Sequence, residues 1–225
     1  MVEKLILIGG GGHCKSCIDV IQAEGRFEIA GIVDSSFRGN DKEGSRLRGN
    51  DKEVYSVLGY PVIGTDDDLP ELIREYKNAL ITVGQIQQPD IRIRLFKLIK
   101  ELGGVLPVVV SPKAYVSKTA RVGAGSIVMH HAIVNAEAVI GVNCILNTGS
   151  LIEHEAVVGD HCHISTYAVL NGQCRVGNRT FIGSRAVLAN NTEVGDDILV
   201  SAGSVVLRSL DKPGTYIGNP LRKIR

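Results

Sequence analysis

Five of the six histidines in this 225-residue chain gather between positions 130 and 163. Neutral imidazole accepts a proton near neutral pH, and such a base is needed when an amine or a hydroxyl group attacks a carbonyl carbon. A general base is therefore expected among these side chains. They are His130, His131, His154, His161 and His163.

His154 is the strongest candidate because it lies in Ile152-Glu153-His154-Glu155, with a carboxylate on each side. One carboxylate could orient the imidazole ring and favour its protonated form. The segment His161-Cys162-His163 offers a competing use. It would place two imidazoles on one strand face, where a neighbouring subunit's histidine could complete a zinc site, as in the trimeric prism-shaped carbonic anhydrases.

A cluster of glycines, Gly9 to Gly12, follows a predicted strand and precedes a predicted helix that begins near His13. Backbone N–H groups at such a helix start attract phosphate, and Asp34 after the second strand could accept ribose hydroxyls. The dinucleotide pattern is incomplete because Cys14 replaces its third glycine. The segment is interpreted as a nucleotide or nucleotide-sugar site, and a tight turn without a ligand is the alternative.

The spacing Cys14-Lys15-Ser16-Cys17 is that of a redox pair, and a helix start lowers the pKa of a thiol. Nothing else in the sequence supports redox chemistry, and incidental helix cysteines fit equally well. Five cysteines without a secretory context predict reduced thiols.

The histidine-rich part of the chain follows a six-residue repeat, with a mostly small residue four positions after each aliphatic one. This period fits a short strand and a corner, three of which make one coil of a parallel β-helix. From Val116 to Val206 it predicts about five coils of 18 residues, with aliphatic and small positions inward, including Cys144, Cys162 and Cys174. The aliphatic series is Val116, Val122, Val128, Val134, Ile140, Leu146, Ile152, Val158, Ile164, Leu170, Val176, Ile182, Leu188, Val194, Val200 and Val206.

Glycine recurs every eighteen positions directly after an aliphatic residue, and asparagine takes the same place after other aliphatic residues of the series. Both residue types tolerate the backbone angles of corners, so these positions are predicted to be corners. The histidines all avoid the inward positions and are expected on the outer surface. The recurring residues are Gly123, Gly141, Gly159, Gly177, Gly195, Asn135, Asn147 and Asn171.

The residues before the repeat alternate between strand and helix patterns, which predicts a small, Rossmann-like parallel sheet with helices on its faces. We expect an α/β domain over residues 1–110, a boundary at Ser111-Pro112 and a β-helix domain over 111–225. Residues 35–58 are predicted to be an inserted loop, because RGNDKE occurs at 38–43 and again at 48–53. The predicted strands are 4–8, 28–33, 60–63, 79–83 and 105–110, and the predicted helices are 14–22, 69–76 and 91–102.

The composition limits the kinds of molecule that this protein is expected to bind. A net charge of +1 and 4% aromatic residues argue against nucleic-acid binding. The apolar run Leu5 to Ile8 is too short for a membrane span or a signal segment, which predicts a cytoplasmic protein without a membrane partner. Small ligands are the better expectation, and the basic tail suits the phosphates of coenzyme A, although solvated termini look the same. Its charged residues are Arg208, Asp211, Lys212, Arg222, Lys223 and Arg225.

Several motifs together carry a resemblance to the sugar O-acyltransferases of the sialic-acid type. This family includes bacterial N-acetyltransferases that act on UDP-4-amino-sugars and on perosamine. Some members carry a second acid where this chain has Ser35, and a histidine where it has Ser111. The motifs are Leu7-Ile8-Gly9-Gly10-Gly11-Gly12-His13, Gly59-Tyr60-Pro61-Val62-Ile63-Gly64-Thr65, Asn147-Thr148-Gly149-Ser150-Leu151-Ile152-Glu153-His154-Glu155, His163-Ile164-Ser165 and Gly218-Asn219-Pro220.

The resemblance implies a left-handed β-helix and a homotrimer, with acetyl-coenzyme A and a nucleotide sugar bound between adjacent prisms and without a metal. His154 would be the general base and Glu155 its partner, while Asn147 would assist near the acceptor. The resemblance implies contacts of His163, Gly172 and Ala202 with the coenzyme, and of Gly11, Gly12, His13, Asp34 and Ser35 with the nucleotide sugar.

The implied reaction is acetyl transfer to the amine of a nucleotide-linked 4-amino-sugar, as in polysaccharide biosynthesis. O-acetylation of sialic acid or a related sugar is the alternative. A trimeric metal-dependent hydratase and a non-enzymatic β-helix scaffold remain further alternatives. The sequence leaves the sugar and the nucleotide open.

Overall fold

The computed structural model describes residues 2–36, 45–47, 54–86, 89–219 and 221–224. The chain forms two compact units, one of residues 1–84 and 94–107 and the other of residues 85–93 and 108–225. The first is a small Rossmann-like unit of sheet and helices and the second a parallel β-solenoid, which confirms the predicted fold class. Both duplicated RGNDKE segments lie outside the described residues.

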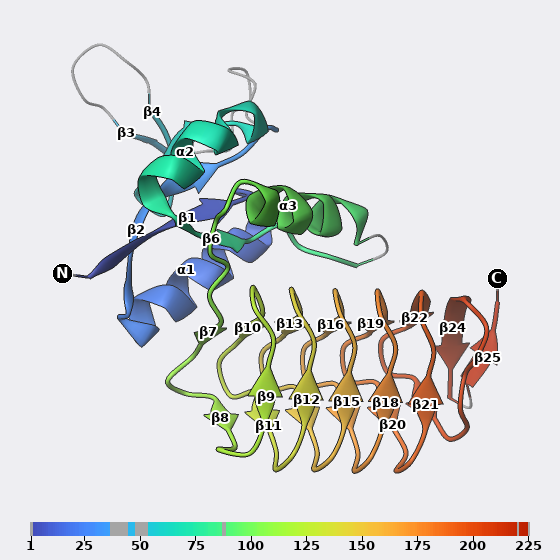
Figure 1. Ribbon diagram of the computed structural model, residues 1–225. Coiled ribbons are helices and arrows are strands. Elements are labelled where there is room, and N and C mark those ends of the chain that lie inside the picture. The colour runs from blue at the N-terminus through green and yellow to red at the C-terminus, as the bar shows by residue number, and fades with distance from the viewer. Residues whose placement is uncertain (1, 37–44, 48–53, 87–88, 220, 225) are drawn as a thin grey trace. The chain divides into compact units, whose positions relative to one another are not determined.

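The first unit is built on a six-stranded sheet of order β3-β4-β5-β2-β1-β6 (Figure 1). Four neighbouring strands, β5, β2, β1 and β6, are parallel, and their apolar runs form a buried core with residues of the helices. The elements are β1 (Glu3–Ile8), α1 (Gly12–Glu24), β2 (Phe27–Val33), β3 (Ser45–Leu47), β4 (Val54–Val57), β5 (Tyr60–Gly64), the 3₁₀ turn η1 (Asp66–Asp68), α2 (Leu69–Tyr76), β6 (Asn78–Ile81) and α3 (Asp90–Glu101).

Two features of this sheet differ from the prediction. The sheet is mixed, because β3 and β4 add antiparallel strands at the edge of β5. A two-residue turn, Leu58 and Gly59 at φ of 49° and 87°, reverses the chain between β4 and β5, as hairpin turns require. The predicted strand 105–110 is also wrong as a single element: Val105 only bridges to Asn78, while Val109–Val110 forms β7 in the solenoid. Pro107 between them has no N–H to give to a ladder.

The second unit stacks short strands into three parallel sheets of a solenoid with about six turns. The prediction of about five coils was one short, because β7 and β24 extend the stack beyond the two ends of the aliphatic series. The strands are β7 (Val109–Val110), β8 (Tyr115–Val116), β9 (Arg121–Val122), β10 (Ile127–Val128), β11 (Ile133–Val134), β12 (Val139–Ile140), β13 (Ile145–Leu146), β14 (Leu151–Ile152), β15 (Val157–Val158), β16 (His163–Ile164), β17 (Val169–Leu170), β18 (Arg175–Val176), β19 (Phe181–Ile182), β20 (Val187–Leu188), β21 (Glu193–Val194), β22 (Ile198–Val200), β23 (Val205–Val206), β24 (Gly214–Gly218) and β25 (Leu221–Lys223).

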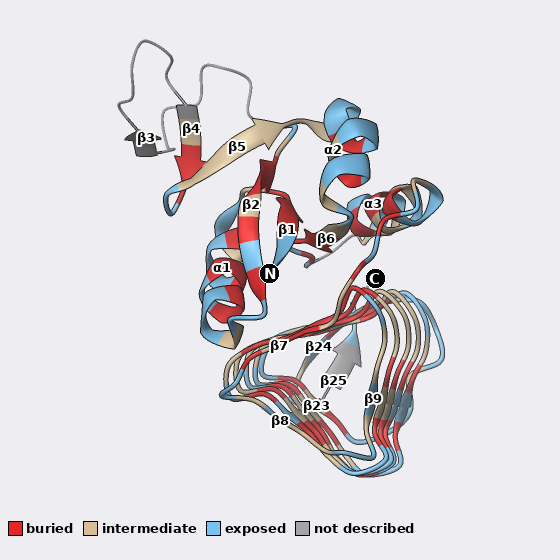
Figure 2. Cartoon of the chain, turned by 60° about the vertical axis from the view of Figure 1, so that its left-hand side comes forward, coloured by how far each residue is buried: buried red, intermediate tan, exposed pale blue. Residues whose placement is uncertain are grey.

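The strands from β7 to β23 pair in the register of eighteen predicted from the sequence: Ile127 pairs with Ile145, which pairs with His163. The next strand, β24, departs from it, since Ile198 in β22 pairs with Gly214 in β24. The inward aliphatic and small residues form one core cluster, in which Cys144, Cys162 and Cys174 are fully buried. Buried segments accordingly recur from coil to coil of the solenoid (Figure 2). None of the five cysteines, all of which lie within the described residues, forms a disulfide.

The corners are built differently from the prediction. The left-handed backbone lies two positions after the recurring glycines and repeats every six residues, for example at His131, Glu155 and His161. The recurring glycines instead permit close stacking, since a Cβ on Gly141 would lie 2.6 Å from the carbonyl carbon of Gly159. Adding a side chain there would force neighbouring coils apart.

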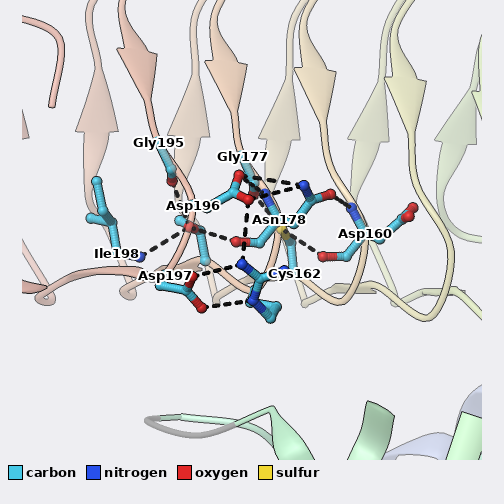
Figure 3. A network of polar contacts seen from close by, with 10 residues as sticks. Asp160, Cys162, Gly177, Asn178, Gly195, Asp196, Asp197 and Ile198 are labelled. Atoms are coloured by element: carbon cyan, nitrogen blue, oxygen red, sulfur yellow. Dashed lines mark hydrogen bonds and ion pairs between the residues drawn. The ribbon is translucent and has the colours of Figure 1, made fainter. Parts of the chain in front are cut away.

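Polar ladders tie consecutive coils together at one corner (Figure 3). Side-chain oxygens of Asp160, Asn178 and Asp196 each accept the backbone N–H of the coil before, all at 2.8 Å. The inward thiol of Cys162 donates to the carbonyl of Gly177 at 2.9 Å. The small inward positions therefore supply hydrogen-bond donors as well as packing, which the sequence pattern did not indicate.

Candidate active site

The exposed corner that follows β14 carries the histidine–carboxylate pair singled out in the sequence. His154 Nδ1 lies 3.2 Å from Glu155 Oε2, and the two side chains are 55% and 47% exposed. Since the ring meets the carboxylate through Nδ1, its Nε2 is the atom that could take a proton from a nucleophile. The structure thus brings together two residues predicted to act together.

Three neighbours fix this pair. A Cβ at Gly172 would lie 2.6 Å from His154 Nε2, so the absent side chain makes room for the ring. Gln173 donates through its backbone N–H to the His154 carbonyl at 3.0 Å and through Nε2 to Glu155 Oε2 at 3.1 Å. Glu153 Oε2 on the other side accepts the His154 N–H at 3.3 Å and is itself held by Asn135 Nδ2 at 2.9 Å. Sequence reasoning missed Gln173, whose signal is its place eighteen residues after Glu155.

A second histidine site lies on β16 and is buried. His163 is 7% exposed, donates Nδ1–H to the Gln85 carbonyl at 2.5 Å and packs edge-on against Phe181. Burial, and secondarily the Arg92 cation, lowers the pKa of His163 to about 4, against the raising effect of the Gln85 bond. Asn147 Nδ2 lies 3.2 Å from His163 Nε2, so these two predicted site residues are in contact.

The expectation that all solenoid histidines are outward and available is therefore wrong for His163. Its side chain does avoid the solenoid core, but residue 85, distant in sequence, covers it. The shared strand face proposed for His161 and His163 is also wrong. His161 lies in a corner turn at φ 58°, and its Nδ1 is 3.0 Å from Asn143 Nδ2. Within the described residues no three histidine, cysteine or acidic side chains are grouped to hold a metal.

The glycine turn of the first unit keeps an open helix start. Helix α1 begins at Gly12 with Gly11 as its N-cap, and a Cβ on either residue would meet no described atom within 4 Å. His13 is half-buried in the first turn. Amides that face open space at a helix start can bind an anion.

Asp34 is already engaged in shaping this turn. Its Oδ2 accepts the Gly10 N–H at 2.5 Å, and its Oδ1 accepts the Ser36 N–H at 2.8 Å. Ser35 Oγ accepts the backbone N–H of Asp66 at 2.8 Å. Both predicted ligand residues therefore lie at the end of β2 beside the glycine turn, and both also hold the local backbone.

The redox interpretation of the two helix cysteines is not supported. Cys14 and Cys17 are both fully buried, and burial raises the pKa of Cys14 to about 11. A redox-active thiol requires the opposite shift. Desolvation thus outweighs the effect of the helix start.

The remaining predicted positions lie at the last coils. Ala202 is exposed in the turn after β22, and Arg208 and Lys212 are exposed beyond β23. Lys223 Nζ lies 5.8 Å from the Tyr216 ring centroid, a cation–π contact. Arg225 and the Arg222 side chain lie outside the described residues.

A groove of about 400 Å³ lies along β18 and β21 and the segment 209–211, and it contains none of the predicted site residues. In the described parts of the chain no helix has the length and apolar character to cross a membrane.

Comparisons with known proteins agree with this picture. The PglD N-terminal domain family matches residues 4–98. The acetyltransferase domain of PglB from Neisseria gonorrhoeae has a TM-score of 0.85 and 32% identity, over 99% of this chain and 100% of that one. PerB from Caulobacter crescentus, in complex with CoA and GDP-perosamine, has a TM-score of 0.86 and 31% identity, over 100% and 99%. A search of curated protein sequences found no match.

A further structure, WeeI from Acinetobacter baumannii, covers 99% of this chain and 100% of its own at a TM-score of 0.74 and 20% identity, which shows the shared fold alone. The solenoid of hexapeptide coils and the similarity to PglB and PerB define the chain as an acyltransferase. It belongs to the family of sugar N-acetyltransferases with a hexapeptide-repeat β-helix, as its similarity to PglB and PerB shows.

Proposed function

We propose that the chain transfers an acetyl group from acetyl-coenzyme A to the amine of a nucleotide-linked 4-amino-sugar. The observation that carries the proposal is the exposed His154–Glu155 pair, held in place by Gly172 and Gln173. The relatives support the substrate class, since PglB was solved with acetyl coenzyme A and PerB with CoA and GDP-perosamine.

His154 acts as the general base in this mechanism. The sugar amine attacks the thioester carbonyl carbon, and Nε2 takes the proton that the nitrogen loses. When the intermediate collapses, the C–N bond is kept, the C–S bond breaks and the proton passes to the leaving thiolate. Glu155, at 3.2 Å from Nδ1, orients the ring and stabilises the imidazolium between these two steps.

The two substrates use different parts of the chain. Gly11, Gly12 and His13 offer the start of α1 to the diphosphate of the nucleotide sugar, with Asp34 and Ser35 beside them. Asn147, which contacts His163, assists near the acceptor, whereas His163, Gly172 and Ala202 belong to the acetyl-coenzyme A side of the reaction.

A homotrimer is proposed from the outward face of one sheet. In the sheet formed by β8, β11, β14, β17, β20 and β23, every outward position is apolar. Two of these side chains, Tyr115 and Ile133, are 58% and 38% exposed. A second copy that covers this face would remove that apolar surface from water. The sheet of β9 to β21 instead presents Arg121, Arg175 and Glu193 outward. The apolar column is Tyr115, Ile133, Leu151, Val169, Val187 and Val205.

Light scattering of the wild type and a Val169→Glu variant tests the assembly. A trimer that the variant weakens supports the proposal, and a monomeric wild type rejects it.

A cytoplasmic location fits the five cysteines without disulfides and the use of acetyl-coenzyme A, and fractionation of the source cells would test it.

Thiol release from acetyl-coenzyme A, measured against a panel of 4-amino nucleotide sugars and sialic acids, tests the activity. Release only with 4-amino-sugars, with a product that resists hydroxylamine, indicates an amide. A hydroxylamine-labile product indicates an ester and favours O-acetylation. No release with any acceptor would reject the proposal.

A further inference from the structure

A series of buried polar groups leads to His163 within the solenoid unit, starting at a buried arginine. Arg92, in the first turn of α3, is 1% exposed, and Asn143 is fully buried. Arg92 Nη2 donates to Asn143 Oδ1 at 2.7 Å and to its backbone carbonyl at 3.2 Å. Asn143 Nδ2 donates to the Arg92 carbonyl at 3.2 Å, so each residue orients the other.

The series continues from Asn143 through His161 to Gln85. Asn143 Nδ2 lies 3.0 Å from His161 Nδ1, and Gln85 Nε2 donates to the His161 carbonyl at 2.9 Å. Gln85 is 3% exposed, and its own carbonyl accepts from His163 Nδ1. An uninterrupted line of contacts therefore joins Arg92 to the His163 ring.

These contacts determine which nitrogen of His163 carries the proton. A carbonyl oxygen has no hydrogen to donate, so the hydrogen between Gln85 and His163 must sit on Nδ1. Burial disfavours a second proton on the ring, and so does the nearby Arg92 cation. Nε2 then presents a lone pair, and Asn147 Nδ2 is the donor in their 3.2 Å contact.

An acceptor nitrogen cannot hydrogen-bond the carbonyl oxygen of a thioester, which is itself an acceptor. The Asn147 amide can, because it has two hydrogens and uses one on His163. Its Oδ1 accepts the Thr148 N–H at 2.8 Å, so the amide is held from both ends. One N–H of fixed direction is left for a ligand.

We propose that Arg92, Asn143 and Gln85 are positioning residues that hold His163 as a hydrogen-bond acceptor. His163 in turn fixes the Asn147 amide as the donor to the acyl carbonyl oxygen. The inference rests on the proposed acetyl transfer and replaces the role that the family resemblance implied for His163, direct contact with the coenzyme, by a role that acts through Asn147.

The first test reads the tautomer of the ring without any turnover. Two-bond proton–nitrogen spectra of protein labelled with ¹⁵N-histidine, assigned with His163→Phe, should show a proton on Nδ1 and none on Nε2 from pH 8 to pH 5.5. Arg92→Met should move the titration of His163 upward toward its ordinary value of about 6.5, and Arg92→Lys, which keeps the charge, should move it less. Arg94→Met, in the same helix with a 60% exposed side chain, is the matched control.

A proton on Nε2 in the wild type would overturn the proposal, and so would an unchanged titration in a folded Arg92→Met protein. Should Arg92→Met not fold, the wild-type spectrum and Arg92→Lys still decide between the two tautomers.

The second test is kinetic. Asn147→Asp replaces the donor with acceptors and should lower kcat about 10²-fold, with KM for acetyl-coenzyme A within about threefold. Asn191→Asp, at an exposed corner, is the matched control and should leave both constants unchanged. Activity of Asn147→Asp within threefold of wild type would contradict the donor role. If the wild type itself releases no thiol, the proposed acetyl transfer is rejected. The spectra of the His163 ring still test its tautomer in that case, because they require no turnover.

Discussion

His154 and His163 lie nine residues apart, half of an 18-residue coil, yet their surroundings give the two rings different chemistry. His154 is exposed, and its Nδ1 meets a carboxylate, which suits the general base proposed above. His163 is buried, and its Nδ1 meets a carbonyl, so the ring stays neutral down to a pKa of about 4. The same residue type thus meets different surroundings on one solenoid, according to which groups lie against each side chain.

The largest expected effect is on the exposed side of this comparison. His154→Ala removes the proposed base and should lower thiol release by about 10² to 10⁴-fold. His131→Asn, at an exposed corner of the same left-handed conformation, is the control and should keep full activity. A loss below tenfold in folded His154→Ala would remove His154 from the mechanism.

The second-largest expected effect is on the stability of the protein, and it arises from the buried His163 ring. The folded state holds the pKa of His163 at about 4, below the ordinary 6.5, so the unfolded chain takes up the proton first as the pH falls. The burial of neutral His163 therefore makes the free energy of unfolding depend on pH. This free energy is about 3 kcal/mol higher above pH 6.5 than below pH 4, and it falls between these two values. Urea unfolding at pH 7 and pH 4.5 would measure it.

The His163→Phe variant should lose this part of the pH dependence, whereas His131→Asn should keep it. If the free energy of unfolding changed equally between pH 7 and pH 4.5 in the wild type and in His163→Phe, the His163 ring would titrate normally in the folded protein.

A third variant moves His154 without removing it. A Cβ on Gly172 would lie 2.6 Å from Nε2, and Gly172 does not have the left-handed backbone that would itself penalise alanine. Gly172→Ala should therefore displace the ring and lower kcat roughly ten- to hundredfold. Unchanged kcat, with a crystal structure showing an unmoved ring, would show that Nε2 tolerates this contact.

The smallest effect concerns the orientation of Glu155. Gln173→Asn keeps an amide that suits the left-handed corner but is too short to reach Glu155 Oε2. The loss of one exposed hydrogen bond should lower kcat about two- to fivefold. An unchanged thermal unfolding midpoint beside the lower kcat would separate this effect from a folding defect.

The solenoid was predictable because its repeat is carried by every coil. The aliphatic series marked the inward positions, and the adjacent residues His154 and Glu155 needed no tertiary information to be paired. The recurring glycines were located correctly but explained wrongly. Periodicity shows where a small residue is required and does not distinguish a left-handed turn from close stacking.

The burial of His163 could not be predicted from the repeat. Gln85 covers it from 78 positions earlier in the chain, beyond any local pattern. The antiparallel strand β4 was missed for a related reason, since it lies within a segment whose duplicated, charged sequence favours a loop. Local periodicity predicts elements, whereas contacts between distant segments decide which side chains are exposed.

The strict register of eighteen bears on how such proteins change length during evolution. Each coil pairs with the coil directly before it and the coil directly after it, through identical positions. Gain or loss of one whole coil would leave every other pairing as it was, whereas a change of a few residues would shift all later corners. A prism of this kind can therefore grow or shrink by whole steps while the coil that carries His154 keeps its immediate neighbours.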